Sequence, residues 1–373
     1  MSAGMSSALR DGSASLCPPR IIYSGGVRLA SILIPLMALL PAAMGQSPRW
    51  VMQESKTQAS LRGVSAVDQN VVWASGSGGT WLRSTDSGVN WQSATVAGAE
   101  DLDFRGLQAF SATSAILMSA GTGTKSRIYK TNDAGAHWNL LFTNPDAEGF
   151  WDSIAFWDEQ HGILAGDVVA GQIAVFTTED GGQTWSRQKM PAALEKEGAF
   201  AASNSSLTLR GTREGRQGRE SVSEQSVWFG STRSRVFRST DGGITWTVAT
   251  TPVSNTSASA GIFSLAFSSE NDGVVVGGDY SKDAEPEHNI AVTADGGRTW
   301  TEPAKGPAGF RSAVLWLPDL KAWLVTGTSG SDIGSAGTWK MFDASSFNAL
   351  SGKSSSAVWA VGAKGRVARL EMK

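Results

Sequence analysis

The stretch that decides the fold is Ser84-Thr85-Asp86-Ser87-Gly88-Val89-Asn90-Trp91, a motif of the form Ser/Thr-x-Asp-x-Gly-x-x-Trp. Four further copies follow at residues 131–138, 178–185, 239–246 and 293–300. Their aspartates recur at intervals of 47, 47, 61 and 54 residues, a period that fits one four-stranded propeller blade. The repeated side chains are Asp86, Asp133, Asp180, Asp241 and Asp295, with Trp91, Trp138, Trp185, Trp246 and Trp300.

Each motif copy predicts a structural turn rather than a reaction centre. An Asp carboxylate can accept backbone N–H groups within a turn, Gly supplies a positive φ, and Trp can bury its ring. One catalytic site does not require five copies of its acid. We therefore expect the motifs to close hairpins at the edge of each blade.

Short alternating apolar runs bounded by Gly flank each motif and predict antiparallel strands. Candidate inner strands lie at 61–67, 104–110, 151–157, from Phe200 onward, 262–267 and 310–316. Degenerate sixth and seventh repeats follow, and the seventh stops one strand short. Residues 49–53 can supply the missing strand, which would leave no open edge. The fold class predicted for residues 46–373 is an all-β, seven-bladed β-propeller of four-stranded antiparallel blades, closed by its N-terminal strand.

The 61-residue interval predicts an insertion in blade four at residues 203–225. This segment combines low hydrophobicity with Arg210, Arg213, Arg216 and Arg219 among Gly, Ser and Glu. Such a composition favours a flexible loop over a binding element.

Residues 1–45 resemble a secretory signal peptide. Arg20 and Arg28 precede the apolar run 29–40, and Ala43-Met44-Gly45 offers small residues for cleavage before Gln46. The alternative is an uncleaved membrane anchor, which the short, Pro-interrupted run disfavours. We expect a secreted or periplasmic protein that touches a membrane only if this segment is retained.

The composition excludes several kinds of chemistry. The single cysteine, Cys17, lies in the segment expected to be removed, so the mature chain has no thiol. A net charge of −2 with scattered charges disfavours nucleic acid as a partner. His161 and His288 lack paired-ligand spacing, and the Gly-rich stretches lack a strand-to-helix context. We expect a monomer with no metal and no cofactor.

The chain resembles the BNR or Asp-box β-propellers over essentially all of its mature region. Within that group, residues 150–158 and 161–167 look similar to bacterial relatives of the photosystem II stability and assembly factor. The resemblance implies a seven-bladed, non-enzymatic scaffold that binds protein partners, often through an arginine-bearing surface. Nothing in the sequence indicates a photosynthetic context, so only the mode of action is transferred.

Aligned inner strands place Arg62, Arg105 and Arg311 at one equivalent position, which Asp152 occupies in blade three. Residues early in inner strands should point toward the channel mouth, where three guanidiniums could bind a carboxylate or phosphate. The alternative is internal pairing with Asp152, Asp167 and Asp279. The predicted binding residues, for a protein partner or an acidic ligand, are Arg62, Arg105, Arg311, Asp152, Asp167, Asp279 and Trp151.

Three enzymatic alternatives remain. Sialidases also carry Asp-box turns and an arginine cluster, but the mature chain offers only Tyr129 and Tyr280 as tyrosine nucleophiles. Asp152 with Asp167 or Glu148 could form the carboxylate pair of another glycoside hydrolase. A propeller-type oxidoreductase is a remote third reading. No catalytic residue is assigned.

Overall fold

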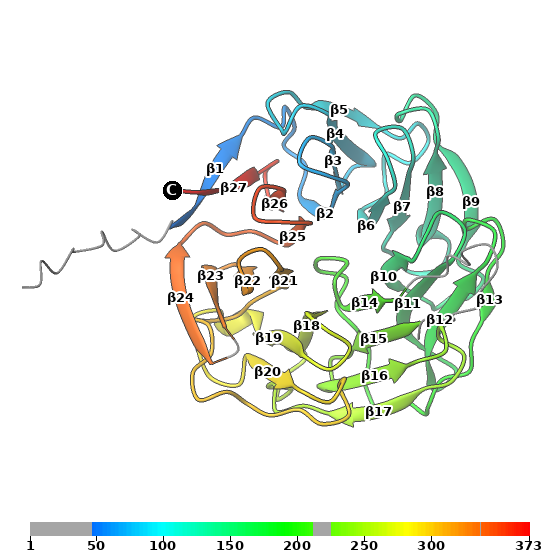
Figure 1. Ribbon diagram of the computed structural model, residues 1–373. Coiled ribbons are helices and arrows are strands. Elements are labelled where there is room, and N and C mark those ends of the chain that lie inside the picture. Colours follow the sequence, from blue (N-terminus) through cyan, green and yellow to red (C-terminus); the bar gives the residue numbers. More distant parts are fainter. Residues whose placement is uncertain (1–46, 212–224, 336) are drawn as a thin grey trace, which may run out of the picture. The chain divides into compact units, whose positions relative to one another are not determined.

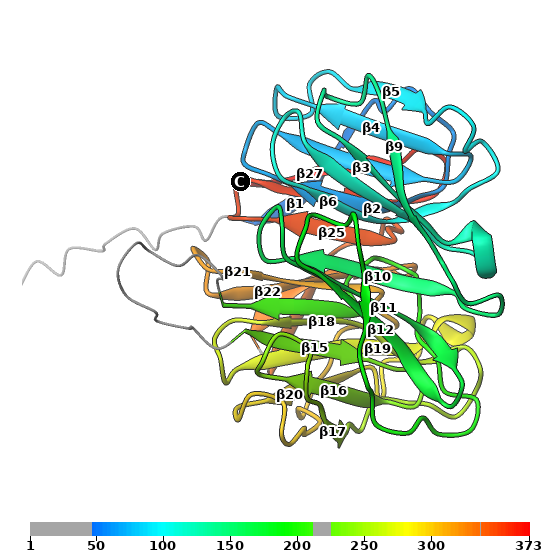
Figure 2. The same ribbon diagram turned by 90° about the vertical axis from the view of Figure 1, so that its right-hand side faces the viewer.

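The structure is a computed structural model that describes residues 47–211, 225–335 and 337–373. These residues belong to the compact unit Gln46–Lys373. They form seven antiparallel sheets arranged in a ring about a common centre (Figure 1). Seen from the side, strands of neighbouring sheets run across the view one above another (Figure 2). The predicted seven-bladed propeller is confirmed.

The first three blades are regular four-stranded sheets. Blade one consists of β2 (Leu61–Ala66), β3 (Val72–Gly76), β4 (Thr80–Ser84) and β5 (Gln92–Thr95). Blade two consists of β6 (Phe104–Ala109), β7 (Ala115–Ser119), β8 (Arg127–Thr131) and β9 (Asn139–Thr143), with the short 3-10 helix η1 (Gly123–Lys125) between β7 and β8. Blade three consists of β10 (Trp151–Phe156), β11 (Gly162–Val169), β12 (Gln172–Thr178) and β13 (Ser186–Arg187).

The next three blades include one that is reduced. Blade four consists of β14 (Leu207–Arg210), β15 (Ser226–Gly230), β16 (Arg235–Ser239) and β17 (Thr247–Thr250). Blade five has β18 (Ala260–Phe267), β19 (Gly273–Asp279), the 3-10 helix η2 (Tyr280–Lys282) and β20 (Ile290–Thr293), with one bridge between Val292 and Thr301 in place of an outer strand. Blade six consists of β21 (Ala313–Leu317), β22 (Ala322–Gly327), β23 (Gly330–Ser335) and β24 (Thr338–Asp343).

Blade seven joins the two ends of the ring. It contains β25 (Ala349–Gly352), β26 (Val358–Val361), β27 (Val367–Met372) and, outermost, β1 (Pro48–Gln53). Strand β1 pairs antiparallel with β27, with Trp50 opposite Leu370. The predicted closure by the N-terminal strand is confirmed, because β1 covers β27 and supplies the outer strand of the blade.

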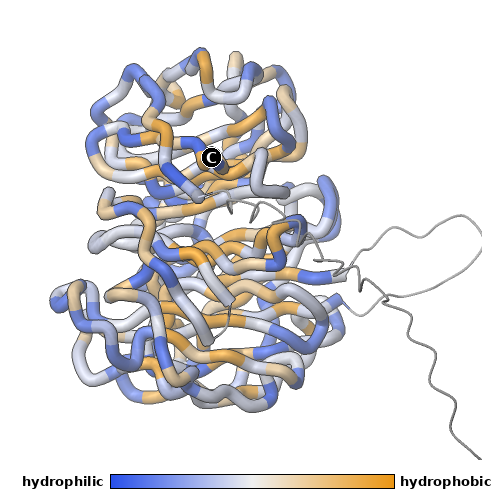
Figure 3. The backbone as a smooth tube through the Cα atoms, turned by 60° about the vertical axis from the view of Figure 1, so that its left-hand side comes forward, coloured by the Kyte–Doolittle hydropathy of each residue, from blue (hydrophilic) through white to orange (hydrophobic). Residues whose placement is uncertain are grey.

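The hydrophobic core lies between blades rather than at one centre. Seven clusters of buried residues occupy the seven interfaces of neighbouring described blades. Apolar residues concentrate in the strands, and hydrophilic ones in the turns (Figure 3). Each motif tryptophan belongs to one of these clusters or packs against it, so the repeats couple each blade to a neighbour.

The Asp-box turns have the predicted geometry, as blade five illustrates. Asp295 accepts hydrogen bonds from the backbone N–H of Thr299 at 3.0 Å and from the hydroxyl groups of Thr293 and Thr299. Gly297, with φ of 87°, donates its N–H to the Thr293 hydroxyl. The pKa values of Asp133 and Asp295 are both lowered to about 2. For Asp133, the largest cause is the hydrogen bonds from His137. For Asp295, burial acts to raise the pKa, but the hydrogen bonds of the turn outweigh it. The carboxylates are therefore ionised structural acceptors.

The expected insertion at residues 203–225 begins too early. The inner strand of blade four is β14, at Leu207–Arg210, and not a strand from Phe200 onward. Residues 201–206, which we name the crossing segment, run through the central channel with Ser203 and Ser206 buried. Of the expected insertion, only residues 212–224 lie outside the described residues.

Candidate functional site

Four of the seven inner strands carry a bulge at blade-equivalent positions. Strands β2, β6, β10 and β18 each shift register by one residue against their neighbour, at Arg62, Arg105, Asp152 and Phe263 respectively. A bulge leaves one residue outside the ladder and redirects its side chain. Blade-equivalent positions thus carry two arginines, one aspartate and one phenylalanine.

Arg311 does not share this position, and its predicted alignment was wrong by one residue. In blade one, Gly63 pairs with Ser75, and in blade six Ala313 pairs with Thr326, so Gly63 and Ala313 are equivalent. The residue before each is therefore also equivalent, and Arg62 corresponds to Ser312. Arg311 instead takes the buried place of Leu61 and is fully inaccessible. A shift of one residue reverses the facing of a strand residue. Its guanidinium forms a buried ion pair with Asp332, with Nε 2.8 Å from Oδ2, and is not available to a ligand.

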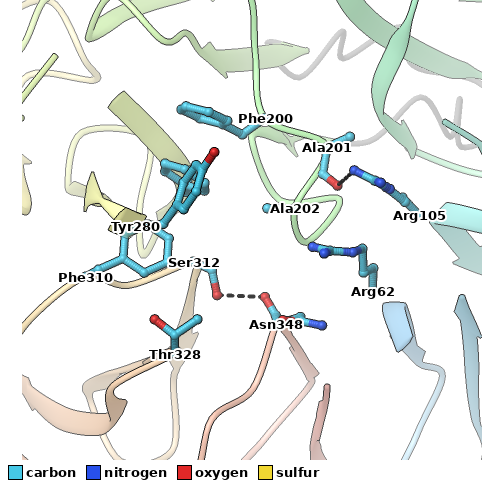
Figure 4. Close-up of a pocket in the computed structure, with 11 residues that line it drawn as sticks. Arg62, Arg105, Phe200, Ala201, Ala202, Tyr280, Phe310, Ser312, Thr328 and Asn348 are labelled. Carbon is cyan, nitrogen blue, oxygen red and sulfur yellow. Dashed lines mark hydrogen bonds between the residues drawn. The ribbon is translucent and has the colours of Figure 1, made fainter. Parts of the chain in front are cut away.

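A cavity of about 400 Å³ opens at the end of the channel where the inner strands begin. We name it the mouth pocket. Arginines lie on one side and aromatic rings on the other, with the crossing segment between them (Figure 4). Its lining side chains are Arg62, Arg105, Phe200, Ala201, Ala202, Phe263, Tyr280, Phe310, Ser312, Thr328 and Asn348.

The crossing segment closes the floor of this pocket. Asn204 joins blades two and three, because its Nδ2 donates to the carbonyls of Leu107 and Ile154 while its Oδ1 accepts from the N–H of Ile154 at 2.9 Å. Ser203 donates to the carbonyl of Ser312 at 2.8 Å. A second cavity, of about 280 Å³ and lined by Ser203 and Asn204, lies at the far ends of the inner strands. The segment therefore lies between two separate cavities.

The two pocket arginines differ in how their charge is satisfied. Arg105 donates Nε to Asp103 at 2.8 Å and Nη1 to the carbonyl of Ala201 at 3.3 Å. No hydrogen bond or ion pair connects Arg62 to another described residue. Burial lowers the pKa of Arg62, the positive charge of Arg105 lowers it further, and Asp103 opposes both. Arg62 remains protonated at neutral pH and presents a cation in need of an anion.

The opposite wall is an aromatic cluster that the sequence prediction missed. Phe200 and Phe263 stack with centroids 3.7 Å apart, and Phe310 meets Phe263 edge-on at 4.6 Å. Tyr280 packs beside all three rings and is 51% exposed at the rim. Phe263 could have been found from its register equivalence with Arg62, but only once the bulges were known.

Asp152 and Asp167 do not pair with the predicted arginines. Asp152 is buried, and its Oδ2 has no hydrogen-bond partner in the structure. Burial raises the pKa of Asp152 well above its usual range, and the charge of Asp167 adds to this while Arg105 opposes it. Asp167 accepts the N–H of Ala199 at 3.0 Å, and burial raises its pKa too. Asp167 lines a separate cavity of about 740 Å³, together with Glu148, on the other side of Phe200.

Two other predicted binding residues have structural partners instead. Burial would raise the pKa of Asp279, but hydrogen bonds from Ser259, Ser281 and Ser257 outweigh it and hold that pKa below its usual range. Trp151 is fully buried and stacks on Phe142 at 5.5 Å. The indole of Trp151 is thus part of the core between blades two and three and is inaccessible to a ligand.

Residues 47–211, 225–335 and 337–373 contain no group of three or more His, Cys, Asp or Glu that could hold a metal ion. No helix within that same part of the chain is long and apolar enough to cross a membrane.

Comparisons with known proteins agree with the architecture. Residues 237–248 match the BNR/Asp-box repeat model, whereas no curated protein matches the chain. A solved structure of YCF48 bound to D1 peptide is similar, with a TM-score of 0.59 and 16% identity, covering 88% of this chain and 98% of that one. The WD40 propeller domain of Doa1 has a TM-score of 0.57 at 12% identity, covering 87% and 97% of the two chains, and U3-55K has 0.58 at 11%, covering 86% and 97%. The chain is a seven-bladed β-propeller built on BNR/Asp-box repeats, with the fold of YCF48 and WD40 propellers.

Proposed function

We propose that the chain is an exported, non-enzymatic binding scaffold that acts as a monomer and engages an anionic group of a protein partner at its mouth pocket. The main support for this proposal is the environment of Arg62. It is a half-buried cation without a partner among the described residues, and it lies in a cavity beside Arg105. An unpaired cation in a partly desolvated cavity gains from an anion that accepts its hydrogen bonds.

Protein binding is favoured by the fold and by the solved neighbours. YCF48 has been solved with a D1 peptide, and its fold is shared over most of this chain. Propellers present a broad face made of loops around a central opening, which suits a large partner. The identity of the partner in YCF48 is not transferred.

The carboxylates are poorly arranged for glycoside hydrolysis. Such enzymes need an acid and a base or nucleophile on two sides of one substrate. Asp152 is buried outside the mouth pocket, and Asp167 and Glu148 line the neighbouring cavity. Tyr129 is buried, and no described carboxylate forms a hydrogen bond with Tyr280, as activation of a phenol nucleophile requires. These observations favour a scaffold over a hydrolase.

The proposed function is tested by partner capture. The Arg62→Gln/Arg105→Gln double variant should lose its specific partners from an envelope extract, whereas Arg49→Gln should retain them. Arg49 is a suitable control because it is exposed on β1 and pairs with Glu371, away from the channel. Undiminished capture by the double variant contradicts the proposal, as does turnover of aryl glycosides that Asp152→Asn abolishes.

Export is tested separately, by fractionation and N-terminal sequencing of the protein produced from the full chain. The proposal expects an envelope or secreted product that begins at Gln46. A cytoplasmic product that retains residues 1–45 would contradict it.

A further inference from the structure

The mouth pocket has two chemically different walls and a closed floor, and together they define a ligand more closely than the arginines alone. The floor consists of Ala201 and Ala202, at the start of the crossing segment. Because this segment is tied to blades two, three and six, a chain cannot pass through the channel at this point. A ligand that enters the pocket must therefore either end there or turn back through the mouth, and a terminal group fits with the least bending.

The size of the cavity limits what can end there. A volume of about 400 Å³ lies near the lower end of the range for small-molecule pockets. It admits one ring-sized group and a short skeleton rather than a folded element. Polar side chains on the remaining side, Ser312, Thr328 and Asn348, can hydrogen-bond such a skeleton.

The wall formed by Arg62 and Arg105 favours a ligand group with a single negative charge. Arg62 offers a planar fork of N–H donors, and a carboxylate matches that fork with two parallel bonds. Nε of Arg105 already donates to the carboxylate of Asp103. The negative charge of Asp103 would repel a doubly negative group more than a singly negative one. A carboxylate therefore suits this wall better than a dianionic phosphate.

The aromatic wall selects a flat apolar group beside that charge. Phe263 and Phe310 are buried but line the cavity, and Tyr280 leaves half of its surface exposed at the rim. A ring placed here can stack or meet these rings edge-on, which adds to the gain from burial. A purely acidic side chain would leave this wall unused.

We propose that the mouth pocket binds a carboxylate that carries an aromatic ring a few bonds away, either as a free arylalkanoic acid or as the last residue of a chain. Arg62 holds the carboxylate, while Phe263, Phe310 and Tyr280 hold the ring. An internal Asp or Glu lacks the ring, so it does not satisfy both walls. This inference rests on the proposed use of the same pocket for binding, and it names the ligand chemistry.

The test is calorimetric titration of the purified protein with matched probes. 3-Phenylpropionate is compared with 3-phenylpropanamide, and a hexapeptide ending in a free Phe acid is compared with its C-terminal amide. The acids should bind and the amides should bind weakly. Arg62→Gln should weaken the acids roughly 10- to 100-fold, as expected for loss of a charged hydrogen-bonding partner. Arg49→Gln should leave binding unchanged, and thermal melting checks that each variant is folded.

A second variant keeps the cation but fills the pocket. Thr328 is exposed on the loop after β22, so Thr328→Trp should be tolerated and should block the acids. Binding of the free acid alone identifies a small-molecule site, binding of the peptide acid alone identifies a chain terminus, and either outcome supports the inference. Equal binding of acid and amide, an unaffected Arg62→Gln variant, or failure of both acids would overturn it. If capture of partners still depends on Arg62 and Arg105 while both acids fail, the scaffold function stands and this inference falls.

Discussion

Arg311 and Asp332 form an ion pair that is closed to water inside blade six. Nε of Arg311 lies 2.8 Å from Oδ2 of Asp332, and both side chains are almost fully buried. Nη1 of Arg311 is also committed, to the carbonyl of Phe310 and the hydroxyl of Ser329. This arginine supports the structure, in contrast to Arg62, whose charge faces the mouth pocket.

Breaking this pair should destabilise the propeller without removing the binding site. Arg311→Met leaves Asp332 buried and unpaired, so we expect a loss of about 3–5 kcal/mol in the free energy of unfolding. The double variant Arg311→Met/Asp332→Leu should recover most of that loss, because it leaves no buried charge alone. Urea unfolding measures both. A folded double variant that had lost its partners would contradict the structural role of Arg311.

Asn204 should be the most sensitive position of the crossing segment. It adopts a left-handed backbone with φ of 59°, and its amide satisfies groups on two blades. Asn204→Ala leaves the Ile154 N–H without a partner, so a loss of about 2 kcal/mol or more in unfolding free energy is expected. Asn204→Gly loses the same bonds but accepts a positive φ, so it should be less damaging by roughly 1 kcal/mol. Equal stability of Asn204→Ala and the wild type would show that the segment is not held as described.

The Asp-box carboxylates should make the propeller sensitive to acid. Because the folded pKa of Asp295 is lowered to about 2 from a usual 3.8, its contribution is present above about pH 4 and is lost as pH falls toward 2. Asp295→Asn should reduce the slope of urea midpoint against pH in this window. An unchanged slope would argue against the ionised turn acceptor.

Asp152 should act in the opposite direction. Its folded pKa is raised, so the stability linked to its protonation is present at pH values below the usual 3.8 and is lost as pH rises through the folded pKa. Asp152→Asn cannot ionise and should therefore raise the urea midpoint at pH 7 relative to the wild type. Asp101→Asn, at an exposed carboxylate, serves as the control. Destabilisation at pH 7 by Asp152→Asn alone would mean that its ionised form has partners that this structure lacks.

The repeats predicted the blades and their closure because the Asp-box turns are local and recur with the period of a blade. Blade four was harder, since Phe200 resembles the start of a strand but belongs to the aromatic wall, and β14 begins only at Leu207. The Ser-rich composition around Ser203 favoured a flexible loop in the sequence analysis. In the structure, the hydroxyl and amide groups of this segment hydrogen-bond to polar groups that are buried where it crosses the channel.

Two of the three predicted arginines share one position, and the third does not for a related reason. Phe104-Arg105 and Phe310-Arg311 look alike in sequence, yet strand pairing places the two arginines one residue apart in register. Leu61 and Arg311 each pack their backbone against the glycine that ends the second strand, Gly76 and Gly327 respectively. Register depends on pairing between strands, which a motif alignment does not contain.

The central claim is that partners bind at the mouth pocket and not at the Asp-box turns. The two sites lie on opposite faces, because first and third strands run in the same direction: the inner strands begin at the pocket, and the third strands end at the turns. A photo-crosslinking residue with a small aliphatic diazirine side chain, which leaves open the pocket that Trp would fill, is therefore placed at Thr328 on the pocket. It is compared with the same residue at Val89, which is 77% exposed in the first Asp-box turn.

The account predicts adducts with a partner from position 328 that disappear when Arg62→Gln and Arg105→Gln are added, and no such adducts from position 89. Adducts from position 89 alone, or adducts from position 328 that persist without both arginines, would contradict it.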